Sequence, residues 1–174
     1  HYNYGHDEMD ERVNEHGEYR YYFEVPEQWS DQHVKIVFEG VMTDAEVKIN
    51  GQLAGEKHQG AFYEFKYDIS GLLKFGESNL LEVKVDKASS NESINYAERK
   101  ADFWIFGGIF RPVYLQVFPQ NHIERVAIDA KASRAMRVDA YIDCDEAGDL
   151  RLELQDLQGN RIEALRPETL KKSA

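Results

Sequence analysis

A short aromatic segment in the second half of the chain carries the side chains best suited to binding a small polar molecule. Asp102 stands directly before Phe103 and Trp104, and two consecutive glycines, Gly107 and Gly108, follow. A carboxylate accepts hydrogen bonds from sugar hydroxyls while an aromatic ring stacks on the C–H face, so the pattern indicates carbohydrate binding. The same residues also fit a structural role, in which Asp102 caps a turn and Trp104 packs in the core. The paired glycines allow the backbone to bend or to approach a neighbour closely.

Histidines are the other residues that could bind a ligand. Three of them near the start of the chain, His1, His6 and His16, lie among acidic residues. Imidazole and carboxylate groups can hold a divalent metal ion. No helical or hairpin spacing organises this group, so a solvated leader is the simpler interpretation. His58, in a predicted loop, can either donate a hydrogen bond to a ligand or lie on the surface. We predict that the chain binds no metal and no cofactor.

Composition excludes several classes of function. The chain has 174 residues and 20.2 kDa, and its net charge of −11 gives a pI near 5.0. Such an acidic surface repels phosphate backbones, so we predict no nucleic-acid partner. No apolar run approaches the ~18 residues of a membrane span, and no signal peptide opens the chain. Cys144 is the single cysteine, which excludes an internal disulfide.

Apolar residues alternate with polar ones at a period of two, which predicts strands rather than helices. The alternating segments are 34–38, 45–49, 81–85, 113–117, 126–128 and 150–154. Residues 19–25 form a denser aromatic run, which predicts a strand covered on both faces. Asn50-Gly51 supplies the positive φ angles of a type I′ hairpin turn. Short strands separated by such turns predict an antiparallel sandwich or barrel.

Two short helices and a domain boundary are also predicted. Residues 68–75 could form one helical turn with Ser70 as N-cap, and residues 167–172 could begin a C-terminal helix. Aromatic residues become rare after residue 119, which predicts a first domain over 1–119 and a second over 120–174. The second domain has strands predicted at 123–130, 136–142, 150–155 and 161–165. It is shorter than the roughly 100 residues of a seven-stranded sandwich, so it is expected to be incomplete.

Several segments together resemble the N-terminal sugar-binding domain of glycoside hydrolase family 2, which includes β-galactosidases, β-glucuronidases and β-mannosidases. They occur in the family's order, over about residues 17–118, and residues 122 to about 165 resemble the first strands of the immunoglobulin-like domain that follows. The matching segments are the opening strand 17–26, the F-x-G-V segment 37–41 with A-x-V-x-x-N-G at 45–51, the loop and strand 55–70, the turn 76–79, and the signature 102–113.

This resemblance implies an all-β fold: a jelly-roll (galactose-binding-like) β-sandwich followed by a partial immunoglobulin-like β-sandwich. In the family a catalytic barrel comes next. The resemblance implies that Asp102 reaches into the barrel mouth and contacts the terminal sugar, while Phe103 and Trp104 shape the same edge. Arg111 is expected to form an internal ion pair. One departure, Gly60-Ala61 where Gly-Gly is frequent, leaves the expected fold unchanged.

The function expected from the resemblance is that of a non-catalytic N-terminal fragment of a retaining exo-β-glycosidase, β-galactosidase-like, that is inactive alone. Retaining hydrolysis needs two carboxyl groups about 5–5.5 Å apart, and the family's acid lies in a Gly-Asn-Glu segment. The Asn-Glu pairs at 14–15 and 91–92 lack that glycine and lie in polar, loop-like stretches, so no catalytic residue is predicted. The alternatives are a free-standing carbohydrate-binding module and a sandwich used only for assembly.

The expected partners are a glycan's terminal sugar and the catalytic barrel, which is too long, at roughly 250 residues, to be contained here. Exposed strands in 123–165 could also pair between two copies of the chain, giving a homo-oligomer. The family's occurrence in glycan-degrading bacteria suggests the periplasm or the cell surface. The chain starts without Met, so processing or trimming is expected.

Overall fold

The computed structural model describes residues 16–99, 106–133, 135–144 and 150–162. The chain divides into two compact units, His1–Asp143 and Cys144–Ala174. The division predicted at residue 119 rests on composition and stays a prediction. Among the described residues, no helix is long and apolar enough to cross a membrane.

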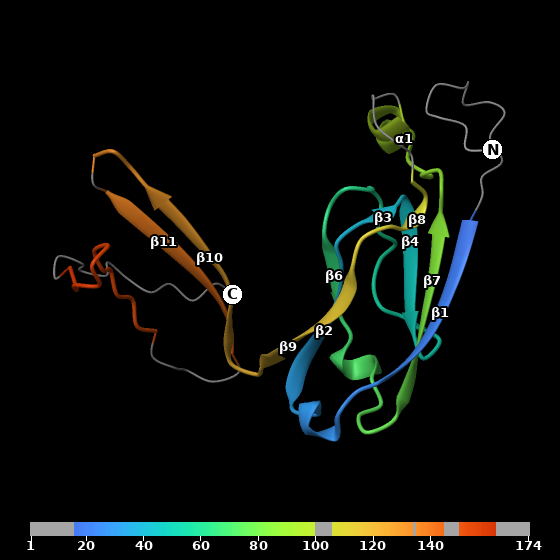
Figure 1. The fold of residues 1–174 in the computed structure, drawn as a ribbon, viewed down its shortest axis with the longest axis horizontal. Helices are drawn as coiled ribbons and strands as arrows, with labels where there is room; N and C mark the ends of the chain where they lie inside the picture. The colour runs from blue at the N-terminus through green and yellow to red at the C-terminus, as the bar shows by residue number, and fades with distance from the viewer. Residues whose placement is uncertain (1–15, 100–105, 134, 145–149, 163–174) are drawn as a thin grey trace. The chain divides into compact units, whose positions relative to one another are not determined.

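One sheet of the first unit contains four antiparallel strands in the order β1-β7-β4-β5 (Figure 1). These strands are β1 (His16–Glu24), β7 (Ser78–Asp86), β4 (Asp44–Ile49) and β5 (Gln52–Leu53). Asn50 and Gly51 join β4 to β5 with φ angles of 52° and 81°. Both angles are positive, as a type I′ turn requires, so the predicted hairpin is confirmed.

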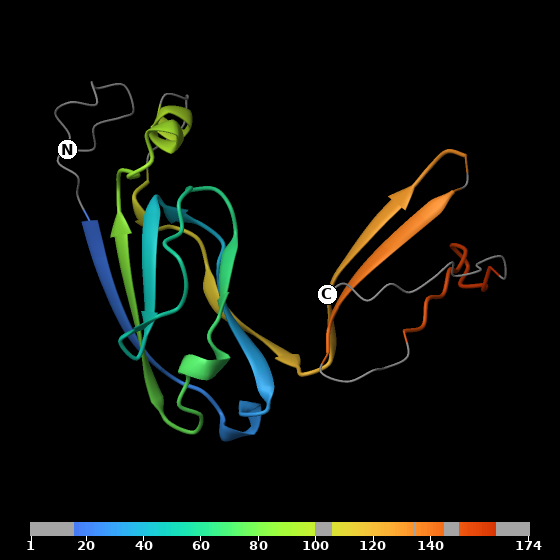
Figure 2. The same ribbon diagram turned by 180° about the vertical axis from the view of Figure 1, so that it is seen from behind.

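A second sheet has the order β6-β2-β9, and a two-stranded sheet pairs β3 with β8. These strands are β6 (Phe65–Asp68), β2 (Gln32–Phe38), β9 (Val113–Pro119), β3 (Val41–Met42) and β8 (Gly108–Ile109). Figure 2 shows the larger sheets from behind. In both views the β3–β8 pair and helix α1 (Glu92–Arg99) lie at the same end of the sandwich.

The core lies between the two larger sheets, where every second residue of β2, β4 and β7 points inward. Its buried members from these strands are Val34, Ile36, Phe38, Ala45, Val47, Ile49, Val83 and Val85. Burying one such large side chain contributes about 1.5–3 kcal/mol. The period of two seen in the sequence is therefore the inward and outward alternation of a β-sandwich, and the predicted all-β class is confirmed.

Two asparagines fix the turns at one end of the four-stranded sheet. Asn79 is fully buried, and its amide group donates to the carbonyls of Lys74 and Glu77. Its Oδ1 accepts from Asn50 at 2.8 Å, and Asn50 in turn accepts from the backbone N–H of Leu80. These bonds satisfy polar atoms that would otherwise destabilise the interior.

Strand β1 corrects the prediction that residues 19–25 are covered on both faces. Tyr19, Tyr21 and Tyr22 are 41%, 66% and 70% exposed. The strand lies at the edge of its sheet and pairs only with β7, so the opposite sheet covers little of it. Phe23 alone among these rings packs against the core. Aromatic density indicates a strand but not its place in the sheet.

Helical structure also differs from the prediction. Residues 68–75 contain a short 3₁₀ turn, Ser70–Leu72, but Ser70 is not its cap. Asp68 Oδ1 instead accepts hydrogen bonds from the Ser70 N–H and hydroxyl at 3.0 and 2.7 Å, while the Ser70 hydroxyl accepts from the Val34 N–H. A second 3₁₀ turn spans Glu27–Trp29. The helix predicted at 167–172 lies outside the described residues.

After β9 the chain forms the antiparallel hairpin of β10 (His122–Ala130) and β11 (Met136–Asp143), which confirms the strands predicted there. Strands are also predicted at 150–155 and 161–165, of which residues 163–165 lie outside the described residues. Within residues 150–162 an isolated bridge joins Gln155 to Arg161. Asp156 stabilises the intervening turn by accepting a hydrogen bond from the backbone N–H of Asn160.

Candidate functional site

The predicted sugar contacts Asp102, Phe103 and Trp104 lie outside the described residues. The chain on both sides is described: α1 ends at Arg99, and Phe106 leads through the paired glycines into β8. Whatever residues 102–104 contact, they are attached to this frame. The geometry of the frame is given by the described residues before and after this segment.

The paired glycines confirm the predicted close approach of the backbone to a neighbour. Gly107 and Gly108 have φ angles of 76° and 78°, which side chains with a Cβ rarely adopt. A Cβ on Gly108 would also collide with the hydroxyl of Tyr19. Gly108 pairs with Met42 across the β3–β8 sheet. This turn is therefore built for glycine and fixes where β8 begins.

An aromatic cluster includes the phenylalanines on both sides of the glycines. The Phe106 and Phe110 rings are stacked with 5.2 Å between their centroids, and Phe62 meets Phe110 edge-on at 6.3 Å. Phe106 is 59% exposed. A partly exposed ring held by a second ring offers a flat apolar face, which is the kind of surface on which the C–H face of a sugar stacks.

Arg111 lies beside this cluster and does not make the predicted ion pair with any acidic side chain in the described ranges. Its guanidinium carbon is 5.4 Å from the Phe110 ring centroid. Its Nη1 donates long hydrogen bonds of 3.4 Å to the backbone carbonyls of Glu39 and Phe62. The side chain crosses Gly40, where a Cβ would lie 2.8 Å from Arg111 Cδ. Arg111 therefore links the F-x-G-V segment to the signature segment.

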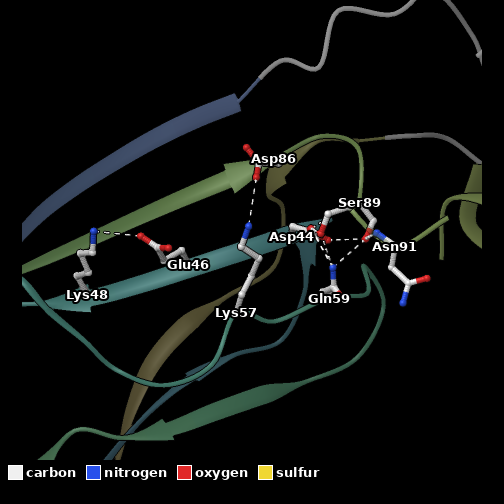
Figure 3. A network of polar contacts seen from close by, with 9 residues as sticks. Asp44, Glu46, Lys48, Lys57, Gln59, Asp86, Ser89 and Asn91 are labelled. Carbon is white, nitrogen blue, oxygen red and sulfur yellow. Dashed lines mark hydrogen bonds and ion pairs between the residues drawn. The ribbon is translucent and has the colours of Figure 1, made fainter. Parts of the chain in front are cut away.

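A buried carboxylate anchors the loops at this end of the sandwich (Figure 3). Asp44 is 1% exposed. Its Oδ1 accepts from the Ser89 hydroxyl at 2.6 Å, and its Oδ2 accepts from the Ser90 N–H, the Ser90 hydroxyl and Gln59 Nε2 at 2.8–3.1 Å. Burial alone would raise the pKa of Asp44, but these hydrogen bonds outweigh it and lower the pKa below its usual value. The anion joins β4 to two loops.

His58 has a structural place in one of those loops. It exchanges backbone hydrogen bonds with Ala45, and its ring stacks on Phe65 with 3.7 Å between centroids. Its Nε2 lies 2.8 Å from the Gly60 carbonyl. Burial lowers the pKa of His58 and outweighs the nearby carboxylates that would raise it. The interpretation of His58 as a ligand donor is therefore less favourable than a structural role, because its Nε2 already has a partner.

Helix α1 is a feature that the sequence interpretation missed, since residues 91–92 had been assigned to a loop. Asn91 Oδ1 accepts from the Ser93 N–H at 3.0 Å, which is an N-cap bond. Asn95 exchanges two hydrogen bonds with the backbone of Ser89, at 2.8 and 2.6 Å. The asparagine before Glu92 was the available signal. These contacts hold the start of the helix against the loop that Asp44 anchors.

The other end of α1 is held by Glu98, which sequence reasoning did not single out. Glu98 is 6% exposed, and its Oε1 accepts from the backbone N–H of Ala61 at 2.8 Å. No periodic or motif signal marked this residue.

Elsewhere, the described ranges hold no group of three or more His, Cys, Asp or Glu residues that could bind a metal ion, and His1 and His6 lie outside them.

Comparison with known proteins matches this frame to one family. Residues 5–119 match the profile described as "Glycosyl hydrolases family 2, sugar binding domain". The chain is 38% identical to a β-galactosidase of Thermoanaerobacter pseudethanolicus over 109 residues, which are 62% of this chain and 14% of that protein. It is 32% identical to a β-galactosidase of Clostridium acetobutylicum over 168 residues, 91% of this chain and 18% of that protein.

Among solved structures, the β-glucuronidase of Bacteroides uniformis is similar with a TM-score of 0.57 and 30% identity. The similarity covers 64% of this chain and 13% of that one. The chain thus spans less than a fifth of the length of these relatives. The sandwich described above is the jelly-roll domain with which such proteins begin, in agreement with the fold expected from the sequence.

Proposed function

Because this chain belongs to glycoside hydrolase family 2 and carries its sugar-binding domain, we propose that it is the non-catalytic N-terminal part of a retaining exo-β-glycosidase. β-Galactosidase is the activity we propose for the longer protein, since the two relatives described above carry that name. The observation that carries the proposal is the family match over residues 5–119, in a chain that covers less than a fifth of its relatives. The carboxyl pair that retaining hydrolysis needs is assigned to the catalytic barrel.

In this proposal Asp102 accepts hydrogen bonds from hydroxyls of the terminal sugar, while Phe103 and Trp104 line the same edge. Two described features support the assignment. The glycine turn fixes the backbone just after this segment, and the exposed Phe106 ring next to it is already stacked on Phe110. The domain would narrow the barrel mouth so that only the end of a glycan enters.

The direct test uses the longer chain with its barrel and compares hydrolysis of 4-nitrophenyl β-galactoside and β-glucuronide. We expect the galactoside to be the better substrate. Asp102→Asn should lower kcat/KM roughly 10- to 100-fold, because a hydrogen bond to a charged group contributes about 1.5–3 kcal/mol. Asp129→Asn, an exposed change on the β10 strand, is the matched control. Unchanged turnover in Asp102→Asn would contradict the proposed role of Asp102 and keep open the alternative of a sandwich used only for assembly.

A free-standing binding module is the second candidate, and the exposed Phe106 ring favours it. Calorimetry of residues 1–174 with galactose, glucuronic acid and mannose separates the two candidates. We expect millimolar or undetectable affinity, because one carboxylate and a few rings offer few contacts to offset the cost of association. Micromolar binding would favour the module.

We also propose that the chain self-associates through the β10–β11 hairpin. Directly opposed residues of an antiparallel pair share a face, so Val126 with Ala140 and Ile128 with Val138 form one apolar face. Val126 and Ile128 are 48% and 66% exposed. A second copy of the chain can cover this face.

A further inference from the structure

Within the described part of the chain, only one of the two carboxylate oxygens of the buried Glu98 accepts a hydrogen bond. Its Oε1 accepts from the Ala61 N–H. Its Oε2 is also buried, and no atom in the described part of the chain hydrogen-bonds to it. Burying a carboxylate with so few donors opposes folding, because the lost hydration is not replaced. The hydrogen bond that Glu98 makes within the described ranges indicates a role in holding the Ala61 loop in place.

That contact joins two segments that frame the proposed sugar-binding edge. Glu98 lies in the last turn of α1, while Ala61 is fully buried in the loop before β6. The next residue in that loop, Phe62, contacts the ring of Phe110. The loop approaches α1 closely at Gly60, where a Cβ would lie 3.7 Å from Glu98 Oε1. Gln59 of the same loop bonds to Asp44 and Ser90 near the start of the helix, while the Glu98–Ala61 bond fixes the loop against the last turn of the helix.

We propose that Glu98 is a positioning residue for sugar binding. Its bond to Ala61 holds Phe62, and through Phe62 the stack of Phe110 and Phe106, in the place that a bound glycan requires. This inference rests on the proposed function, because the stack matters only if the edge contacts a sugar. Glu98 itself does not touch the sugar. Its loss should therefore weaken substrate binding more than it slows the chemical step.

The experiment compares two substitutions in the longer chain with its barrel. Glu98→Met removes the acceptor and keeps a similar volume, while Glu98→Gln keeps an amide oxygen that can accept from the Ala61 N–H. We expect Glu98→Met to raise KM roughly tenfold, with kcat within about twofold of the wild type, because misplaced contacts weaken binding. Glu98→Gln should keep KM near the wild-type value. Glu92→Gln, on the exposed first turn of α1, is the control.

Thermal unfolding separates positioning from general stability. Glu98→Met should change the unfolding temperature little, because removing a buried carboxylate favours folding while leaving the buried Ala61 N–H without its acceptor opposes it. If Glu98→Met unfolds at a lower temperature and its kcat falls by as large a factor as its KM rises, the role of Glu98 is merely structural. That result would overturn the inference. Unchanged KM in Glu98→Met, with Asp102→Asn impaired, would overturn this inference alone. Unimpaired Asp102→Asn would overturn the proposed function instead.

Amide hydrogen exchange tests the same bond in residues 1–174 without the barrel. The Ala61 N–H should exchange slowly in the wild type and in Glu98→Gln. In Glu98→Met it should exchange at least roughly tenfold faster, because the Ala61 N–H loses the acceptor that Glu98 provides. Equal exchange in all three proteins would show that Glu98 does not hold the loop.

Discussion

The imidazole of His58 lies between the Phe65 ring and the Gly60 carbonyl, and this setting decides how it titrates. Burial disfavours the charged imidazolium, so the pKa of His58 in the folded chain lies below the ordinary value of 6.5. The unfolded chain therefore takes up a proton at a higher pH than the folded chain. The stability that neutral His58 contributes is complete above about pH 6.5 and is lost as the pH falls from there toward the lowered pKa.

This predicts a difference in pH dependence between the wild type and His58→Gln. Glutamine can still donate to the Gly60 carbonyl, but it does not titrate. Between about pH 7 and about pH 5, the free energy of unfolding should fall more steeply in the wild type, because only the wild type gains the His58 proton on unfolding. Urea unfolding at several pH values measures both slopes. Parallel slopes would contradict the assigned pKa shift.

Buried polar residues such as Asp44 and Glu98 show what single-residue patterns miss. Asp44 begins an alternating strand, and nothing in its neighbours in sequence indicated that it would be buried with four donors around it. Its partners Ser89 and Ser90 are 45 and 46 residues away. Patterns at a period of two or 3.6 carry no information about contacts at that separation.

At the scale of elements, the alternating strands and the Asn50-Gly51 turn were predictable because their signals are local. Helix α1 was not, because it depends on an asparagine cap and on a bond from Glu98 to a distant loop. The exposure of β1 was not predictable either, since edge position is a property of sheet order. Sequence resemblance, by contrast, indicated the family motifs, and the structure explains two of them by packing.

The glycine of the F-x-G-V motif illustrates this packing. Gly40 has no left-handed backbone, but a Cβ would lie 2.8 Å from Arg111 Cδ, 3.1 Å from Phe110 Cζ and 3.2 Å from the Ala61 carbonyl oxygen. The Ala61 oxygen belongs to the backbone and cannot move without shifting the loop. The glycines of two motifs far apart in the sequence, Gly40 and the Gly107-Gly108 pair, thus allow close packing at the same end of the sandwich.

Gly40→Ala should therefore destabilise the domain by about 1–3 kcal/mol, the usual cost of overpacking. Gly71→Ala is the matched control, since a Cβ there meets nothing within 4 Å. Chemical denaturation of residues 1–174 measures both. Equal stability of the two variants would show that Arg111 and Phe110 can move aside without cost.

At the scale of the whole molecule, self-association is the outcome that the exposed hairpin face predicts. Sedimentation should show association that increases with concentration. Ile128→Lys should shift the chain toward monomer, because a charge in an apolar contact is costly. Ala127→Lys, on the opposite and charged face, should leave association unchanged. A single monomeric species at high concentration in the wild type would contradict the proposal.

For the molecule as a whole, resemblance to a family predicts the fold better than it predicts the roles of single residues. The order of motifs identified the family and the sandwich, while Asp102, Phe103 and Trp104 were inferred by carrying over a role. Their assignment remains a proposal that activity measurements must test. The residues that frame them, Glu98 among others, emerged only from three-dimensional contacts, because neither motif nor alternation distinguishes a buried Glu on a helix from a solvated one.

The bond between Asp44 and Ser89 also has a consequence for the order of folding. Asp44 and Ser89 lie at the same end of the β4–β7 pairing, because Asp44 is opposite Asp86 at the end of β7, and the pairing of these strands brings the serine to the carboxylate. We expect the anchorage of α1 to form after this strand pairing and to be lost before it on heating. Proteases should nick the region around residues 89–99 well before the sandwich melts.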